Sequence, residues 1–454
     1  MSIVTVNVSQ QVGSAPNTLQ RTGALVSTGG TTLAQYGTLL LTQLSDLTSS
    51  LAGAVTISSA SEVSTTVTVT TSGNHGYTTG DMVTIAGFTT PGYNGTWAIT
   101  VTGATTFTFT TTSGLTTPAV GSGVVTDQDV SELLAMATTF FAQGSSVAVY
   151  VLELGHGTAD VNVAALSTYL TANPLKFYRY LVPRGFDADA NFVTLVATFS
   201  SATAKTYFHV TATLSTYSSF TTANGKAVIL FIEAAGIPST EFTSAAPFWV
   251  ALSYQPSSTN QVTPYCYSYL FGVTPYPATT TQAATFKAAN LNYVTTGAEG
   301  GISDLMLVNG TQCDGNPLNY WYSVDWMQVN VDQAISAAII NGSNNPLAPL
   351  YYNQQGVNVL QIVSQSIANQ AVSNGLAVGP VTGYGLTSAA FTALLQSGNA
   401  PLGVLVNAVP FASFVALNPS DYPIGLYSGL SISYTPARGF QNIVFNVNVS
   451  NFIP

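Results

Sequence analysis

The sequence predicts a multidomain protein of mixed α/β and α+β class, and three patterns support this. Residues 127–275 alternate between short apolar runs and segments with helical spacing, which is typical of an α/β sandwich with a parallel-type sheet. Residues 55–126 are rich in Thr and alternate with a period of two, as in an all-β module. Residues 276–429 carry amphipathic stripes, which predict a helical α+β domain.

These patterns divide the chain into five parts. They are an N-terminal arm and linker (1–30), the α/β domain (31–54 plus 127–275), an inserted all-β module (55–126), the helical α+β domain (276–429) and a C-terminal arm (430–454). The module is expected to interrupt the connection between a strand and the next helix. Such insertions lie in exposed loops, because a buried backbone would not tolerate them.

Both ends of the chain are predicted to be extended strands, with a Ser-, Thr-, Asn- and Gly-rich linker at residues 10–30. Apolar residues alternate with polar or smaller ones at Val4, Val6 and Val8, and at Ile443, Phe445, Val447 and Val449. The run 430–434 precedes the second set and suggests a hairpin. Two interpretations remain open: the strands pair within their own fold, or they extend the sheets of neighbouring subunits by β-augmentation.

The predicted elements follow one another closely. Strands are expected at 37–43, 147–154, 177–183, 206–213 and 227–233, and helices at 130–141, 161–170, 191–199, 245–252, 279–291, 324–339, 359–371 and 387–395. The apolar run 227–232 fits a central strand that is buried on both faces. Asn374-Gly375 is a C-terminal cap signal for the helix that ends before it.

The 454 residues include only 6% charged side chains, with 8 basic against 18 acidic residues. Nucleic-acid binding is excluded as a function class, because basic residues are absent between Arg21 and Lys176 and between Lys287 and Arg438. Direct membrane insertion is not expected, since no apolar run reaches the ~20 residues of a spanning helix. A neutral polar surface suits a subunit covered by its own copies, and equally an acidic extracellular β-protein.

No catalytic, cofactor-binding or metal-ligating residue is predicted. His75, His156 and His209 are far apart in the sequence, and no pair has metal-ligand spacing. Cys266 and Cys313 are expected to be reduced packing residues. The loop 155–160, GHGTAD, could bind an anion at a helix N-terminus, but it lacks a phosphate-binding motif. A tight turn with Asp160 as the helix cap is the favoured interpretation.

Two pairs of carboxylates and one aromatic cluster complete the candidate sites. Asp127 with Asp129, and Asp187 with Asp189, could serve acid/base chemistry or bind calcium. Each pair precedes a predicted helix, so N-terminal capping is favoured. The cluster YWYSVDW, residues 320–326, could stack on a sugar or base, but it leads into an amphipathic helix and is expected to make core contacts.

The inserted module is similar to a small β-domain often found in phage tail and other virion proteins. The likeness rests on GNHGYTTGDMVTIAGF, which includes His75-Gly76-Tyr77, and on GYNGTWAITV, which includes Tyr93 and Trp97. The resemblance implies a fold and, by itself, no activity.

Outside the module, the chain resembles the contractile-tail sheath proteins of myophages, as a divergent branch. The similar segments are 129–155, 248–275, 281–296 with Lys287, Asn290, Asn292 and Tyr293, and the helix around Trp326 through Gly375. Together they span most of residues 37–379 apart from the insertion. These segments are elements of the fold, and the resemblance depends on their order and spacing along the chain.

This resemblance implies a structural subunit of the virion without enzymatic activity or cofactor. It would be assembled in the host cytoplasm into stacked hexameric rings around an inner tube, with the tail tube, baseplate and tail terminator proteins as partners. The terminal arms would be exchanged between neighbours, and the helical domain would face the tube through Asp325, Gln328 and Asp332. The alternative is a virion or secreted surface-binding protein that contacts glycans or receptors through Trp97 and Tyr93 of the module.

Overall fold

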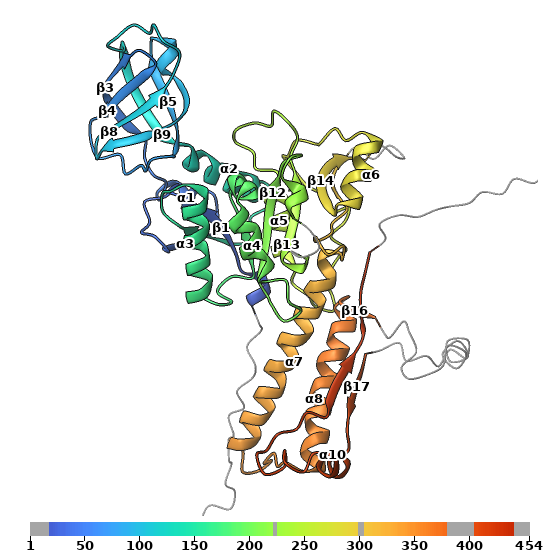
Figure 1. Ribbon diagram of the computed structural model, residues 1–454. Coiled ribbons are helices and arrows are strands. Elements are labelled where there is room, and N and C mark those ends of the chain that lie inside the picture. Colours follow the sequence, from blue (N-terminus) through green and yellow to red (C-terminus); the bar gives the residue numbers. More distant parts are fainter. Residues whose placement is uncertain (1–17, 221–224, 298–303, 379–403, 440–454) are drawn as a thin grey trace, which may run out of the picture. The chain divides into compact units, whose positions relative to one another are not determined.

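The computed structural model describes residues 18–220, 225–297, 304–378 and 404–439. The chain divides into two compact units, which are described separately (Figure 1). Unit 2 comprises Leu19–Ser253 and Tyr265–Asn316, and unit 1 comprises Met1–Thr18, Tyr254–Pro264 and Pro317–Pro454. None of the helices in the described ranges is long and apolar enough to cross a membrane.

Unit 2 is built on an eight-stranded sheet whose six central strands are parallel. From one edge to the other, the strands are β15 (Leu305–Val308), β14 (Leu291–Thr296), β13 (Val228–Ile232), β12 (Tyr207–Ala212), β11 (Arg179–Leu181), β1 (Gly23–Ser27), β10 (Val149–Glu153) and β2 (Thr38–Leu41). The two edge strands, β15 and β2, are antiparallel to their neighbours. The predicted parallel-type sheet is therefore confirmed for its centre only.

Helices cover both faces of this sheet and bury a core on each side. One face is covered by α3 (Ala159–Ala172), α4 (Ala190–Ala197) and α6 (Thr280–Ala288), and the other by α1 (Ser45–Thr48), α2 (Gln128–Ala142) and α5 (Ala245–Ser253). Because successive strand residues point to opposite faces, Ala24 and Val26 of β1 join the first core while Leu25 joins the second. The central strands are apolar for this reason.

The position of β1 corrects the sequence prediction of a linker over residues 10–30. Gly23–Ser27 is a fully buried strand that pairs in parallel with both β10 and β11. The short apolar run Ala24-Leu25-Val26 is sufficient, because two neighbouring strands satisfy its backbone and two helical layers cover its side chains.

A second boundary also differs from the prediction. Residues from 276 onward were expected in the helical domain, yet α6 packs on the sheet of unit 2 and β14 pairs in parallel with β13. The helical unit instead resumes at Pro317. Tertiary pairing of β14 explains this difference, since Leu291 and Tyr293 join the same core as the strands beside them.

The module is a seven-stranded antiparallel sheet with a core of its own. Its strand order is β6 (Gly95–Ala98), β5 (Met82–Phe88), β9 (Gly121–Asp127), β3 (Val55–Val63), β4 (Thr66–Thr71), β8 (Thr106–Thr110) and β7 (Thr100–Gly103). The alternating Thr and apolar residues produce one buried face, as the period of two predicts. Strand β9 runs directly into α2, so the module interrupts the connection between β2 and α2 as expected.

The described part of unit 1 contains two long helices, one short helix and two small antiparallel sheets. The helices are α7 (Leu318–Asn344), α8 (Gln354–Ser373) and α10 (Phe411–Leu417), and the sheets pair β16 (Ala377–Val378) with β19 (Thr435–Pro436) and β17 (Leu405–Ala408) with β18 (Leu430–Ser433). Asn374 caps α8 and Gly375 follows with φ +72°, which confirms the predicted C-terminal cap. The predicted helix at 387–395 and the two predicted arm strands lie outside the described residues.

Candidate functional site at the carboxyl ends of the parallel strands

The strand order of unit 2 creates a crevice beside β1, where the connections between strands lead to opposite sides of that strand. From β1 the chain proceeds to β2 and then β10 on one side of it, and afterwards crosses to β11 on the other side. Open α/β sheets bind ligands at such a switch point, outside the carboxyl ends of the strands. A cavity of about 710 Å³ lies there, and its walls include Thr28 after β1, Thr158 after β10 and Arg184 after β11.

The Glu153 carboxylate holds two of the loops that line this crevice. Its oxygens accept hydrogen bonds from Ser27 Oγ and Gly29 N after β1 and from Gly155 N after β10, each at 2.8 Å. Thr31 adds bonds from its backbone N at 3.1 Å and its Oγ1 at 2.7 Å. The side chain is buried, so these five donors replace its hydration. Glu153 therefore fixes the loop that carries His156.

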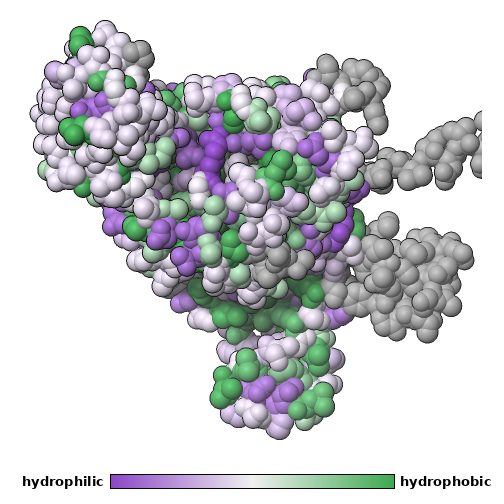
Figure 2. All heavy atoms as spheres, turned by 45° about the horizontal axis from the view of Figure 1, so that its top comes forward, coloured by the Kyte–Doolittle hydropathy of each residue, from purple (hydrophilic) through white to green (hydrophobic). Residues whose placement is uncertain are grey.

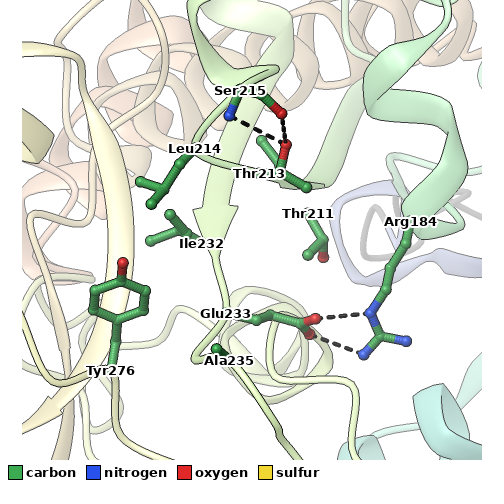
Figure 3. Close-up of a pocket in the computed structure, with 10 residues that line it drawn as sticks. Arg184, Thr211, Thr213, Leu214, Ser215, Ile232, Glu233, Ala235 and Tyr276 are labelled. Atoms are coloured by element: carbon green, nitrogen blue, oxygen red, sulfur yellow. Dashed lines mark hydrogen bonds and ion pairs between the residues drawn. The ribbon is translucent and has the colours of Figure 1, made fainter.

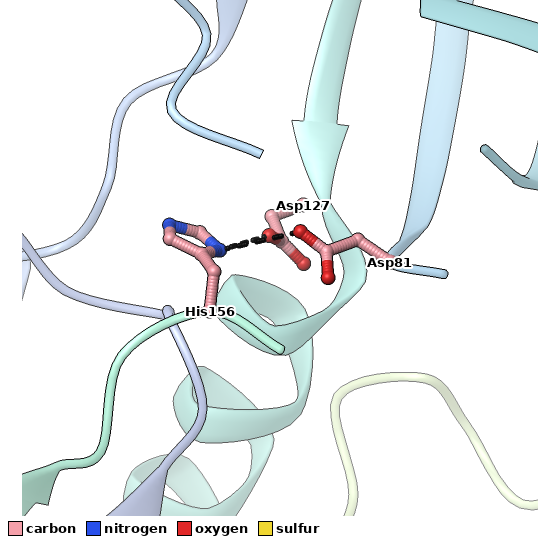
Figure 4. A group of neighbouring side chains, drawn as sticks. All are labelled: Asp81, Asp127 and His156. Carbon is pink, nitrogen blue, oxygen red and sulfur yellow. Dashed lines mark ion pairs between the residues drawn. The ribbon is translucent and has the colours of Figure 1, made fainter. Parts of the chain in front are cut away.

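Three side chains from separate segments converge beside the crevice (Figure 4). His156 comes from the loop after β10, Asp127 from the end of β9 and Asp81 from the module, next to β5. His156 Nδ1 lies 3.1 Å from Asp127 Oδ2 and 3.6 Å from Asp81 Oδ2. The imidazole also packs on the backbone of Gly29 (φ +110°), where an added Cβ would lie 2.2 Å from Nδ1. Only glycine fits at that position.

The electrostatics of this cluster follow from burial and from the neighbouring carboxylates. Contact with Asp127 and then with Asp81 raises the pKa of His156 to about 10. Burial raises the pKa of the Asp127 carboxyl above its ordinary value, against the opposing effect of His156. Burial and the Asp127 charge raise the pKa of Asp129 to about 8. The cluster thus places two carboxyl groups beside one partly exposed imidazole.

A second cavity, of about 410 Å³, lies at the carboxyl ends of β12 and β13 (Figure 3). Its charged groups satisfy one another. Arg184 donates from Nε to Glu233 Oε2 at 2.7 Å and from Nη2 to Glu233 Oε1 at 3.1 Å, which is a bidentate pair. Arg184 also lies over the ring of Phe242 at 4.1 Å. We therefore interpret this constellation as a structural clamp.

The capping predictions for the two aspartate pairs are confirmed for one member of each. Asp127 Oδ1 accepts from Asp129 N at the start of α2, and Asp189 Oδ1 accepts from Asn191 N and Phe192 N at the start of α4. Asp187 instead accepts a hydrogen bond from Thr213 N at 3.1 Å and so holds the turn after β12.

Asp160 is not the cap of α3. Thr158 occupies the N-cap position, and its hydroxyl donates to Asp160 Oδ1. His75 is buried in the module, where its Nδ1 accepts from Tyr77 N at 3.0 Å. His209 lies in β12 and is fully buried beside Arg179.

The predicted tube-facing residues have different environments. Asp325 is 0% exposed within unit 1, so it is not available to another chain, which corrects that prediction. Gln328 and Asp332, on the same helix α7, are exposed. Asp325 lies one helical turn from Tyr322, whose ring contacts Tyr254. The aromatic cluster at 320–326 therefore lies inside α7, where Tyr322 and Trp326 are buried, in agreement with the expected core contact.

The glycan-contact residues proposed for the module are not presented together at its surface. Tyr93 is 0% exposed. Trp97 is half-buried, stacks on Phe109 with ring centroids 4.6 Å apart and donates from Nε1 to Tyr93 O. Both aromatic residues thus contribute to the module core, and Tyr93 cannot contact a ligand.

Sequence reasoning missed the convergence of Asp81, Asp127 and His156. The first and last of these residues belong to different predicted domains, and no spacing rule joins them. One signal was the position of Asp81, which directly follows the turn Thr79-Gly80 and precedes β5. Glu153, at the end of a buried strand, is a second signal that loops gather at this place, because a buried carboxylate requires several hydrogen-bond donors.

The comparisons with known proteins find similarity in fold. No protein family matches the sequence, and no curated protein matches it. The chain is similar to one in the cryo-EM structure of the anti-feeding prophage (AFP) baseplate in the contracted state, with a TM-score of 0.53 and 11% identity over 98% of this chain and 97% of that one. It is also similar to the sheath tail protein Lin1278 from Listeria innocua, with a TM-score of 0.42 and 11% identity over 92% and 94%. This chain therefore shares its fold, over nearly its whole length, with a component of the AFP baseplate structure.

Proposed function

We propose that this chain is the repeating structural subunit of a contractile sheath in a phage tail or a phage-like injection apparatus. The observation that carries the proposal is the fold likeness to the AFP baseplate chain, which includes 98% of this chain. A likeness of the α/β sheet alone would say little, because that architecture hosts many activities. Here the likeness extends over both units. The resemblance of segments 129–155 and 281–296 to sheath proteins supports the same role.

The surface of unit 1 supports assembly with further chains. Large apolar side chains are exposed on α7 and α8, among them Ile340 at 59% and Ile362 at 68%. Figure 2 shows mostly pale residues, with hydrophobic (green) and hydrophilic (purple) residues in several separate patches. Residues 317–454 contain only four charged side chains. Covering such a surface removes apolar area from water at little desolvation cost.

Within this proposal, the subunits polymerise as stacked hexameric rings around a tube. Strands at residues 4–8 and 443–449 would be exchanged between neighbours by β-augmentation. Gln328 and Asp332 on α7 are the proposed tube contacts, because both are exposed. The partners would be the tube, baseplate and tail terminator proteins. The subunit acts by moving as a rigid body between two packings of the lattice, and no catalysis is required.

Electron microscopy of the purified full-length chain tests the proposal. We expect rings or tubes for the full chain. Variants that lack residues 1–17 or residues 440–454 should fold but remain unpolymerised, and circular dichroism with thermal unfolding controls for folding. A full-length chain that stays monomeric at high concentration would contradict the sheath role. Tubes formed by both truncated variants would contradict the exchange of arms alone.

A further inference from the structure

We propose that Asp81, Asp127 and His156 form a binding site for a divalent transition-metal ion, with Zn²⁺ as the best-fitting representative. The site joins the inserted module to the α/β sheet. Asp81 belongs to the module, Asp127 ends its last strand, and His156 belongs to the loop after β10. The inference is independent of the sheath role, since it rests on these three side chains alone.

The spacing of the three donor atoms fits a metal ion. One ligand atom from each residue lies within 4.8 Å of the other two. The distances from His156 Nδ1 are 3.1 Å to Asp127 Oδ2 and 3.6 Å to Asp81 Oδ2. Zinc bonds of about 2.0–2.1 Å in tetrahedral geometry place neighbouring ligand atoms about 3.3 Å apart. The observed distances lie on either side of that value.

The metal-facing atoms of Asp127 and His156 lie within ion-pair distance of each other, yet neither is used in a hydrogen bond. Among the described residues, Asp127 Oδ2 and His156 Nδ1 are buried and neither forms a hydrogen bond of acceptable geometry, although they are close. Asp127 is only 2% exposed. Buried polar atoms normally have partners, so this pair requires an explanation. A metal ion between the two atoms satisfies both of them at once.

Neighbouring groups orient the ligands as they do in known metal sites. Asp127 Oδ1 accepts from Asp129 N at 2.9 Å, which directs Oδ2 toward His156. Asp81 accepts from Thr78 N and from Thr78 Oγ1, each at 2.8 Å. The backbone of Gly29 supports the imidazole ring. The three ligands are thus held from separate directions before an ion arrives.

The chemistry of the donors selects the class of ion. An imidazole nitrogen with two carboxylates suits Zn²⁺ and similar transition metals, whereas Ca²⁺ takes six to eight oxygen ligands. The His156 side chain is 23% exposed, and Asp81 also lines the crevice at the strand ends. Solvent therefore reaches the site, and water can complete the coordination. A bound ion would fix the module in one orientation on the α/β sheet.

The test uses the untagged full-length chain after treatment with EDTA and dialysis. Isothermal titration with Zn²⁺ should show one site per chain, Co²⁺ should give a visible absorption band, and Zn²⁺ should raise the unfolding temperature. Asp127→Asn keeps the helix cap, because Asn caps as well as Asp, yet it removes the charged ligand. We expect this variant and His156→Gln to bind Zn²⁺ at least about tenfold more weakly.

Asp189→Asn is the matched control. It makes the same change at the N-cap of α4, where Asp189 accepts from Asn191 N and Phe192 N, and it should bind Zn²⁺ as the unchanged chain does. Circular dichroism shows whether each variant is folded. Failure of the unchanged chain to bind Zn²⁺ or Co²⁺ overturns the proposal, and so does equal Zn²⁺ affinity in folded Asp127→Asn and Asp189→Asn. A chain that binds Zn²⁺ but does not polymerise would support the metal site and would count only against the sheath role.

Discussion

Unit 2 and unit 1 use their few charged residues differently. In unit 2, the buried Glu153 carboxylate is bonded to loops, and the partly buried Glu233 carboxylate is bonded to Arg184. Unit 1 has few charges to use, since residues 317–454 contain only Asp325, Asp332, Asp421 and Arg438. The two units expose equal numbers of large apolar side chains, although unit 2 has more than twice as many described residues. Unit 2 therefore uses its charged groups to hold its own loops, while unit 1 exposes more large apolar side chains for its size, as the proposed assembly requires.

The largest expected effect concerns that apolar surface. Replacing Ile340 on α7 and Ile362 on α8 together by Asp should reduce polymer formation at least about tenfold, because each buried Ile contributes roughly 1.5–3 kcal/mol to an interface. Stability of the single chain should change little, since both side chains are exposed. Sedimentation and electron microscopy measure the polymer. Val161→Asp, at a 52% exposed position on α3 in unit 2, is the control.

Two outcomes would contradict the difference between the two units. Equal loss of polymer from Val161→Asp and from the double variant would show that both units offer apolar contacts of similar importance. Unchanged polymer in the double variant would show that the exposed faces of α7 and α8 do not take part in assembly.

The next effect is on the stability of unit 2. Glu153→Ala removes the acceptor for five hydrogen bonds that hold the loops after β1 and β10. Leaving buried donors without partners should lower the free energy of unfolding by about 3–5 kcal/mol. Urea unfolding followed by circular dichroism measures the loss. Asp304→Asn, at an exposed position of the same unit, should change it by less than about 0.5 kcal/mol.

The smallest effect is a pH dependence from His209 in the core of unit 2. Burial, and then the charge of Arg179, holds the pKa of His209 well below its ordinary value of 6.5. The folded state therefore binds fewer protons than the unfolded state at mildly acidic pH. Its contribution to stability is present above pH 6.5 and decreases below it, by up to about 1.4 kcal/mol per pH unit.

Urea unfolding at several pH values between 7.5 and 5.5 measures this dependence, in the unchanged chain and in His209→Gln. The difference between the two slopes isolates His209 from other titrating groups. Parallel curves for the two proteins would show that His209 can be protonated in the folded state without cost. A pH dependence caused by His209 would show that buried ionisable groups influence the stability of unit 2, because His209 and Arg179 both lie in its interior.

Local features of the fold were predictable from the sequence. The caps at Asp127, Asp189 and Asn374-Gly375 depend on residues within one helical turn, and the structure confirms them. Strands such as β12 and β13 also appear where apolar runs predict them. Period and capping depend on neighbouring residues only, so sequence patterns identify them well.

Features that depend on distant partners were predicted less well. Residues 23–27 resemble linker in composition, yet β10 and β11 make them the central strand β1. Asp325 was predicted on an accessible face of its helix, but the packing of unit 1 buries it completely. In both cases the neighbours that decide the outcome are more than one element away in the sequence.

The alternation of strands and helices, the separate β-module, the low charge and the likeness to sheath proteins can all be recognised in the amino-acid sequence. Only the tertiary structure brought Asp81, Asp127 and His156 within 4.8 Å of one another. The physical reason is that secondary structure follows from short-range sterics and hydrogen bonds. A site made of two loops and the end of one strand depends instead on the strand order of the sheet and on the place where the module is inserted.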